Sequence, residues 1–234
     1  MEKIVINPDG DITILEGKAQ DPINPRPVAL IGNIFCVAEF IEKRNQQKGL
    51  IVPESHVMIH DENGLIQLTI DEHSPIGVSV LGKLEVHPNF ETLGINDGTL
   101  YTSIALASLI KMNRYLFESS AEAMKLVTVF QNLKATITKE VEKATNDRGN
   151  VKNLQSQVVS NLTIPEKFVV VTPIYKGFAP VHIEVEIILD PNDLSIVLIS
   201  PMARDLQEKE KIAALETQEK LIRELVPWMP VMHV

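Results

Sequence analysis

The chain has 234 residues and a single cysteine, and its hydrophobic (44%) and charged (23%) fractions are those of an ordinary globular protein. These values exclude disorder of the whole chain, and one thiol excludes an internal disulfide. The formal net charge of −9 opposes binding to phosphate backbones unless basic residues cluster locally.

The first 27 residues are expected to form a short hairpin that turns at 7–10, followed by a proline-rich link. They lack the apolar core of a signal peptide, and the most apolar stretch, 100–110, is about half of the ~20 residues that cross a bilayer. We therefore expect a cytosolic protein.

A short apolar strand at 28–31 is expected next, followed by a helix over 33–48 with Asn33 as its N-cap. Cys36 lies in the apolar run 34–38, which favours a small buried side chain over a reactive thiol. Gly49 directly follows this predicted helix, and a glycine at that position is typical of a helix end.

Asn63-Gly64 between two alternating runs predicts a hairpin. A two-residue loop would pair Glu62 with Leu65, and would place His60 opposite Gln67 and His56 opposite Asp71. One face of this hairpin is expected to be core; its residues are Val57, Ile59, Ile66, Leu68 and Ile70.

Two helices are expected over 99–117 and 119–131, the second with the capping-box pattern Ser119 to Glu122. The first is apolar on more than one face, which is typical of a helix that is deeply buried or meets a partner. Its candidate oligomer-interface residues are Leu100, Ile104, Leu106, Leu109 and Ile110.

Residues 133–162 are expected to form a protruding polar β-ribbon that turns at 146–150. Ile137 and Val141 would share one face of its first arm. Residues 132–153 carry the clearest local basic excess of the chain, and the candidate nucleic-acid contacts are Lys134, Lys139, Lys143, Arg148 and Lys152.

Strands are expected at 168–171, 181–187 and 194–200, followed by a charged helix over 202–226 that Pro201 opens. The fold class is therefore α+β, one domain over 1–234. A mainly antiparallel sheet would be built from hairpins, with about four helices (33–48, 99–117, 119–131, 202–226).

No phosphate-binding loop or nucleophile elbow is present in the sequence. His56 and His60 alternate as strand residues, so their imidazoles would stand roughly 13 Å apart and could not share a metal. Glu184 and Glu186 share a strand face, which on an antiparallel sheet is typical of a solvated surface. We expect no catalytic residues, no metal and no cofactor.

The chain resembles the YfdQ-like family of uncharacterised phage and prophage proteins. The resemblance spans about residues 12–230 and is most specific at Leu162-Thr163-Ile164-Pro165-Glu166-Lys167-Phe168 and Pro173-Ile174-Tyr175-Lys176-Gly177. It implies expression in the cytoplasm of a bacterial host and no particular activity.

Three hypotheses follow. The first is a non-enzymatic phage binding protein, homo-oligomeric, that acts on host or phage proteins. The second is a nucleic-acid-binding accessory factor in phage replication or recombination. The third is an enzyme or nucleotide sponge whose site forms between subunits around Glu184 and Glu186.

Overall fold

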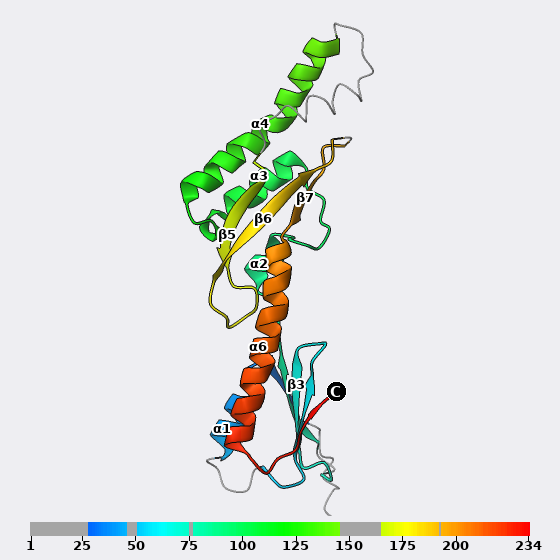
Figure 1. Ribbon diagram of the computed structural model, residues 1–234, viewed down its shortest axis with the longest axis vertical. Coiled ribbons are helices and arrows are strands. Elements are labelled where there is room, and N and C mark those ends of the chain that lie inside the picture. Colours follow the sequence, from blue (N-terminus) through cyan, green and yellow to red (C-terminus); the bar gives the residue numbers. More distant parts are fainter. Residues whose placement is uncertain (1–27, 46–50, 75–76, 146–164, 192) are drawn as a thin grey trace, which may run out of the picture.

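The computed structural model describes residues 28–45, 51–74, 77–145, 165–191 and 193–234. It is elongated, with an upper and a lower lobe that are each built on one β-sheet, and one helix, α6 (Pro201–Leu225), runs from the upper lobe into the lower (Figure 1). The α+β class with mostly antiparallel sheets is confirmed. The hairpin expected before residue 28 lies outside the described residues.

The lower lobe is a five-stranded mixed sheet in the order β1-β4-β3-β2-β8. Its outer pairs, β1 with β4 and β2 with β8, are parallel, while the inner pairs are antiparallel. Helix α1 (Cys36–Asn45) and the second half of α6 pack together over its core. The strands are β1 Val28–Asn33, β2 His56–His60, β3 Leu65–Ile70, β4 Val78–Lys83 and β8 Val231–His233.

The β2–β3 hairpin is confirmed, and its core face is buried as expected at Val57, Ile59, Ile66 and Leu68. Its register differs by two residues, because a four-residue turn at 61–64 replaces the expected two-residue loop and His60 pairs with Leu65. A shift of two preserves the facing of every side chain. Gly64 takes a positive φ of 61° in this turn.

Helix α1 begins three residues later than predicted because Val28–Asn33 continue as a strand. Asn33 caps the following turn, since its Oδ1 accepts a hydrogen bond from the Phe35 N–H at 3.2 Å. The backbone between β1 and α1 passes close to Gly82: a Cβ atom at residue 82 would lie 3.1 Å from the Ile34 carbonyl oxygen.

The upper lobe is a three-stranded antiparallel sheet in the order β5-β6-β7, with two hairpin pairs as expected. One face of this sheet meets the helices in a core that includes Phe130, Val170, Ile183 and Leu198. The elements are β5 Lys167–Thr172, β6 Val181–Leu189, β7 Ile196–Ile199, α2 Pro88–Thr92, α3 Ser103–Met112, the 3-10 turn Arg114–Leu116 and α4 Ser120–Thr145.

The predicted helix over 99–117 is shorter in the structure. Tyr101 exchanges two main-chain hydrogen bonds with Ile196 at the edge of β7, so its backbone is extended. Thr102 then caps α3 by accepting a hydrogen bond from the Ala105 N–H, and Asn113 ends the helix.

The prediction of a β-ribbon is wrong for residues 133–145, which continue α4 as helix. Leu133, Ile137 and Val141 recur every four residues, a spacing that fits both the strand period of two and the helix period of 3.6. A helix already nucleated upstream extends at little cost, so the helical period prevails. The rest of the expected ribbon, 146–162, lies outside the described residues.

The two lobes have separate hydrophobic cores. Ser200 begins the linking helix: its hydroxyl donates to the Glu184 carbonyl and accepts from the Ala203 N–H. Tyr175 contacts both cores and donates to the Gln207 carbonyl at 3.3 Å.

No helix among the described residues is long and apolar enough to span a membrane.

Candidate functional site

Acidic and histidine side chains do not gather into a metal site in the part of the chain that the structure describes. His56 and His60 lie on β2, where His56 pairs with Thr69 rather than Asp71 and His60 with Leu65 rather than Gln67. The His56 Nδ1 lies 3.1 Å from a carboxylate oxygen of Glu72.

Glu184 and Glu186 lie on the face of β6 that points away from the upper core. Glu184 accepts a hydrogen bond from the Lys167 ammonium at 3.0 Å, and this pair raises the pKa of Lys167. The neighbouring strand positions on this face include exposed Val169. Within one copy, Glu184 is therefore paired with a lysine, and both carboxylates belong to a solvated strand face.

The candidate oligomer-interface residues divide into two groups. Leu106 and Ile110 are buried in the upper core, and Leu109 is partly buried against it, so these three side chains pack within their own lobe. Leu100 and Ile104 remain 66% and 51% exposed.

These two exposed residues belong to a longer row of exposed apolar side chains. Ile104, Ser108 and Met112 are four residues apart, which places them on one face of α3. Leu100 precedes this face and Tyr115 follows it, and Met112 and Tyr115 are 77% and 63% exposed. We call Leu100, Ile104, Met112 and Tyr115 the α3 stripe.

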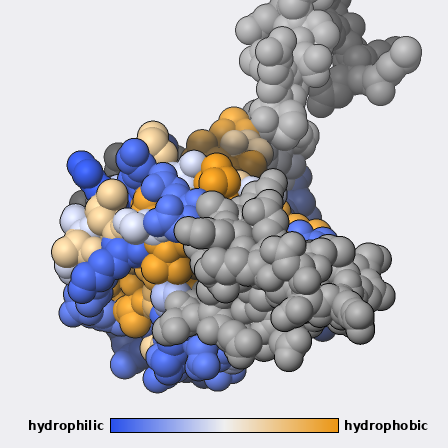
Figure 2. Space-filling model, turned by 90° about the horizontal axis from the view of Figure 1, so that it is seen from above, coloured by the Kyte–Doolittle hydropathy of each residue, from blue (hydrophilic) through white to orange (hydrophobic). Residues whose placement is uncertain are grey.

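Charged side chains lie at both ends of the α3 stripe. Asp97 is exposed before the helix, while Lys111 and Arg114 are exposed at its C-terminal end. Seen from above, the upper end of the molecule shows hydrophobic surface between hydrophilic patches (Figure 2). Exposed apolar surface with a polar rim is typical of a protein–protein contact.

The candidate nucleic-acid residues no longer share a ribbon. Lys134, Lys139 and Lys143 belong to the part of α4 that runs past the upper sheet, interspersed with Glu140 and Glu142 (Figure 1). Arg148 and Lys152 lie outside the described residues.

Cys36 is partly buried at the start of α1 and donates its thiol hydrogen to the Leu81 carbonyl at 3.4 Å. Burial raises the pKa of this thiol, and the charge of Glu39 adds to the effect. Because the thiolate is the reactive form, these contacts favour an inert side chain.

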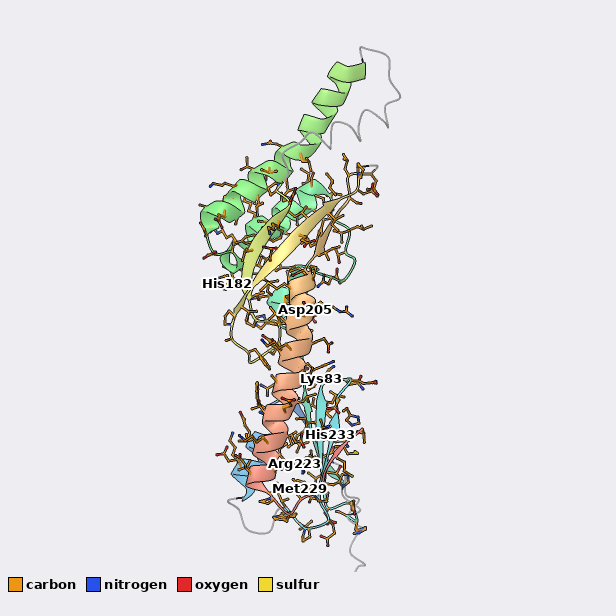
Figure 3. All side chains as sticks on the ribbon, in the orientation of Figure 1. Lys83, His182, Asp205, Arg223, Met229 and His233 are labelled. Carbon is orange, nitrogen blue, oxygen red and sulfur yellow. The ribbon has the colours of Figure 1, made fainter. Side chains whose placement is uncertain are left out.

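The structure reveals a polar clasp at the C-terminal strand that sequence reasoning missed. His233 lies between two carboxylates, with Nδ1 2.9 Å from Asp61 and Nε2 3.2 Å from Glu219. Arg223 holds Glu219 at 2.7 Å and donates to the Val231 carbonyl. Figure 3 shows His233 and Arg223 together in the lower lobe. We call these four side chains the β8 clasp.

The β8 clasp joins three elements, the β2–β3 turn, α6 and β8. Its two carboxylates raise the pKa of His233, with Asp61 the larger cause, while Arg223 and His233 lower the pKa of Glu219. Within the described part of the chain, both ring nitrogens of His233 contact carboxylates, and no serine, threonine or cysteine side chain hydrogen-bonds this imidazole as a nucleophile would. The arrangement therefore orders the C-terminal strand, and no sequence signal brought residues 172 positions apart together.

A second polar pair lies where the lobes meet. The Lys176 ammonium donates to the Glu85 carboxylate at 2.6 Å, which lowers the pKa of Glu85 and raises that of Lys176. Beside it, the ring of Phe178 lies 5.5 Å from that of Phe35 and 5.9 Å from that of Tyr175. These contacts join the loop after β5 to the lower lobe.

A scan against models of protein families finds no match to this chain. A search of curated proteins finds none either. No solved structure matches it.

Proposed function

We propose that the protein is a non-enzymatic binding protein that works as a homo-oligomer. The α3 stripe carries the proposal, because four large apolar side chains, each at least half exposed, lie on α3 and on the chain segments directly before and after it. Burying such a surface is favourable at roughly 25 cal/mol per Å² of apolar area.

A second copy of the chain is the occupant that the charges favour. In a two-fold pair whose axis is perpendicular to α3, the two α3 helices pack antiparallel. Lys111 and Arg114 of one copy then approach Asp97 of the other, and the small Ser108 at the centre lets the helices come close. The stripe is therefore complementary to itself in shape and charge.

The experiment is sedimentation velocity at micromolar concentrations, with Ile104→Glu as the test variant. A charge buried at this interface should raise the dissociation constant about 30-fold or more, the equivalent of roughly 2 kcal/mol. Ile212→Glu on α6 is the matched control, since Ile212 is 53% exposed and Ile104 is 51% exposed. A wild-type protein that stays monomeric would contradict the proposal.

We propose further that this oligomer acts on host or phage proteins in the cytoplasm of a bacterial host. The support is the resemblance of residues 162–168 and 173–177 to the YfdQ-like phage and prophage proteins. Affinity capture from infected cells, with the Ile104→Glu variant as comparison, tests this part.

A nucleic-acid accessory factor is the second candidate, and the lysine-bearing end of α4 favours it. Lys139 and Lys143 are four residues apart on a helix that extends past the upper sheet. Contact with phosphates would give a log–log salt slope of about 0.7–0.9 per contact. Absence of binding to single- and double-stranded DNA at low salt would remove this candidate.

A further inference from the structure

The first strand of the lower sheet is unusually exposed for its composition. Strand β1 lies at the edge of the sheet and reads Val-Ala-Leu-Ile-Gly-Asn, yet Val28, Leu30 and Ile31 are 45%, 44% and 72% exposed. A continuous apolar run of this kind is typical of a strand that is covered on both sides. Among the described residues, β4 is its only strand partner.

Half of the main-chain groups of β1 face outward. The Val28 N–H donates to the Gly77 carbonyl, so Val28 directs its hydrogen-bonding groups toward β4. Because these directions alternate along a parallel strand, Leu30 also faces β4, while Ala29 and Ile31 each present an N–H and a C=O to the edge that no described strand covers.

The edge lacks the features that usually prevent strands from pairing. Natural edge strands carry charges, proline or bulges, whereas 28–33 contain no charged residue and no proline. A charged strand would bring unpaired charges against Val28 and Leu30. The strand that fits is therefore uncharged and apolar, and each copy of this chain provides one.

We propose that β1 pairs antiparallel with β1 of a second copy, across a two-fold axis at Leu30, to give one continuous ten-stranded sheet. This register pairs Ala29 with Ile31 of the partner subunit twice, which forms four main-chain hydrogen bonds. The two Leu30 side chains meet on the helix-covered face, because Leu30 is in register with buried Val80.

Two observations support this geometry. An apolar groove of about 260 Å³ lies beside β1, lined by Val28, Leu30, Phe40, Arg44, Ile70 and Val78, and would receive the partner's Leu30. Helix α1 carries Glu39 in its first turn and Lys43 and Arg44 in its last. The two-fold axis sets the α1 helices antiparallel, so acidic ends approach basic ends.

This inference rests on the proposed function, which it deepens by adding a second self-association surface on the other lobe. A chain with two different two-fold interfaces does not stop at a dimer: it closes into a tetramer or extends into a fibre. The α3 stripe and the β1 edge together therefore give an assembly larger than two copies.

Sedimentation velocity of four proteins tests both surfaces. We expect the wild type to exceed a dimer, Ile31→Lys and Ile104→Glu each to stop at a dimer, and the double variant to be a monomer. Ile188→Lys on β6 is the strand control, since Ile188 is also exposed, at 47%, and should leave the assembly unchanged.

The outcomes separate the two proposals. An Ile31→Lys protein that assembles like the wild type, while Ile104→Glu becomes a monomer, overturns the β1 pairing and leaves the proposed function intact. If instead Ile104→Glu assembles like the wild type while Ile31→Lys becomes a monomer, the α3 interface is overturned and the β1 pairing is retained. A monomeric wild type overturns both.

A cysteine across the two-fold axis tests the register. In a Cys36→Ala background, Leu30→Cys should form an intermolecular disulfide under mild oxidation, since non-hydrogen-bonded antiparallel pairs hold Cβ atoms about 4.5–5.5 Å apart. The matched Ile212→Cys variant should not. Slow amide exchange of Ala29 and of the substituted residue 31 in the monomeric double variant would overturn the proposal, because another segment of the same chain would then cover the edge.

Discussion

The two lobes are built from similar elements but are connected differently. In the upper lobe, strands β5, β6 and β7 follow one another and pair as hairpins. In the lower lobe, β1 pairs in parallel with β4, and β2 pairs in parallel with β8, whose residues lie 174 positions later. The strands of the upper sheet therefore pair locally, whereas the lower sheet requires segments from both ends of the described chain.

This difference has a consequence for stability. The whole upper lobe lies between β4 and the second half of α6, so the lower sheet closes only after the chain has returned along that helix. Contacts that close long loops form late and are costly in entropy. We expect mutations in one core to leave the stability of the other core unchanged. We also expect the stability of the lower lobe to depend on α6 remaining helical.

The largest expected effect is that of Phe130→Ala in the upper core. Phe130 is completely buried, and its removal should lower the free energy of unfolding of the upper lobe by about 3–5 kcal/mol. Hydrogen exchange followed for each lobe measures it. An equal loss of protection in β2 and β3 would show that the lobes unfold as one unit and would break the comparison.

A smaller effect is expected for Gly82→Ala in the lower lobe. The new Cβ would lie 3.1 Å and 3.2 Å from two carbonyl oxygens of the β1–α1 crossover, and the resulting shift should cost about 1–3 kcal/mol. Gly77→Ala is the matched control, because its Cβ would meet nothing within 4 Å. Chemical denaturation of both variants gives the difference, and equal midpoints would contradict the close approach.

Ser200→Ala tests the helix that joins the lobes. The variant loses the N-cap of α6 and leaves the Glu184 carbonyl without its hydroxyl donor, which should cost about 1–2 kcal/mol. Ser200→Thr keeps the hydroxyl and serves as the control. We expect exchange to accelerate at both ends of α6; a change confined to the upper end would mean that the lower lobe holds its half of the helix independently.

The smallest expected effect is the pH dependence of the β8 clasp. Asp61 and Glu219 raise the pKa of His233, so its stabilising contribution is fully present below the ordinary histidine value of about 6.5 and is lost as the pH rises through the folded value. The amides of Met232 and Val234 should therefore lose protection, relative to the intrinsic base-catalysed exchange of a free amide, at neutral to alkaline pH.

His233→Gln is the control for this pH dependence, because glutamine does not titrate. Exchange of Met232 and Val234 that responds to pH equally in the variant and the wild type would rule out His233 as the cause. The half-exposed position of His233 keeps the expected effect small.

Local patterns in the sequence were enough for the antiparallel parts of the fold. Alternation around Asn63-Gly64 gave the core face of the β2–β3 hairpin, and alternation from Val181 to Ile187 gave β6. Pro201 marks the start of α6, because proline is favoured at the first position of a helix. These features depend on residues close in sequence, so period and turn chemistry determine them.

Tertiary structure decided the rest. A spacing of four at Ile137 and Val141 fits both helix and strand, and only the continuous α4 resolves it. The pairing of β2 with β8, the clasp of His233 with Asp61 and the exposure of β1 all depend on which distant segments meet. Periodicity describes which face of an element is apolar, but the chain topology determines what that face and that edge contact.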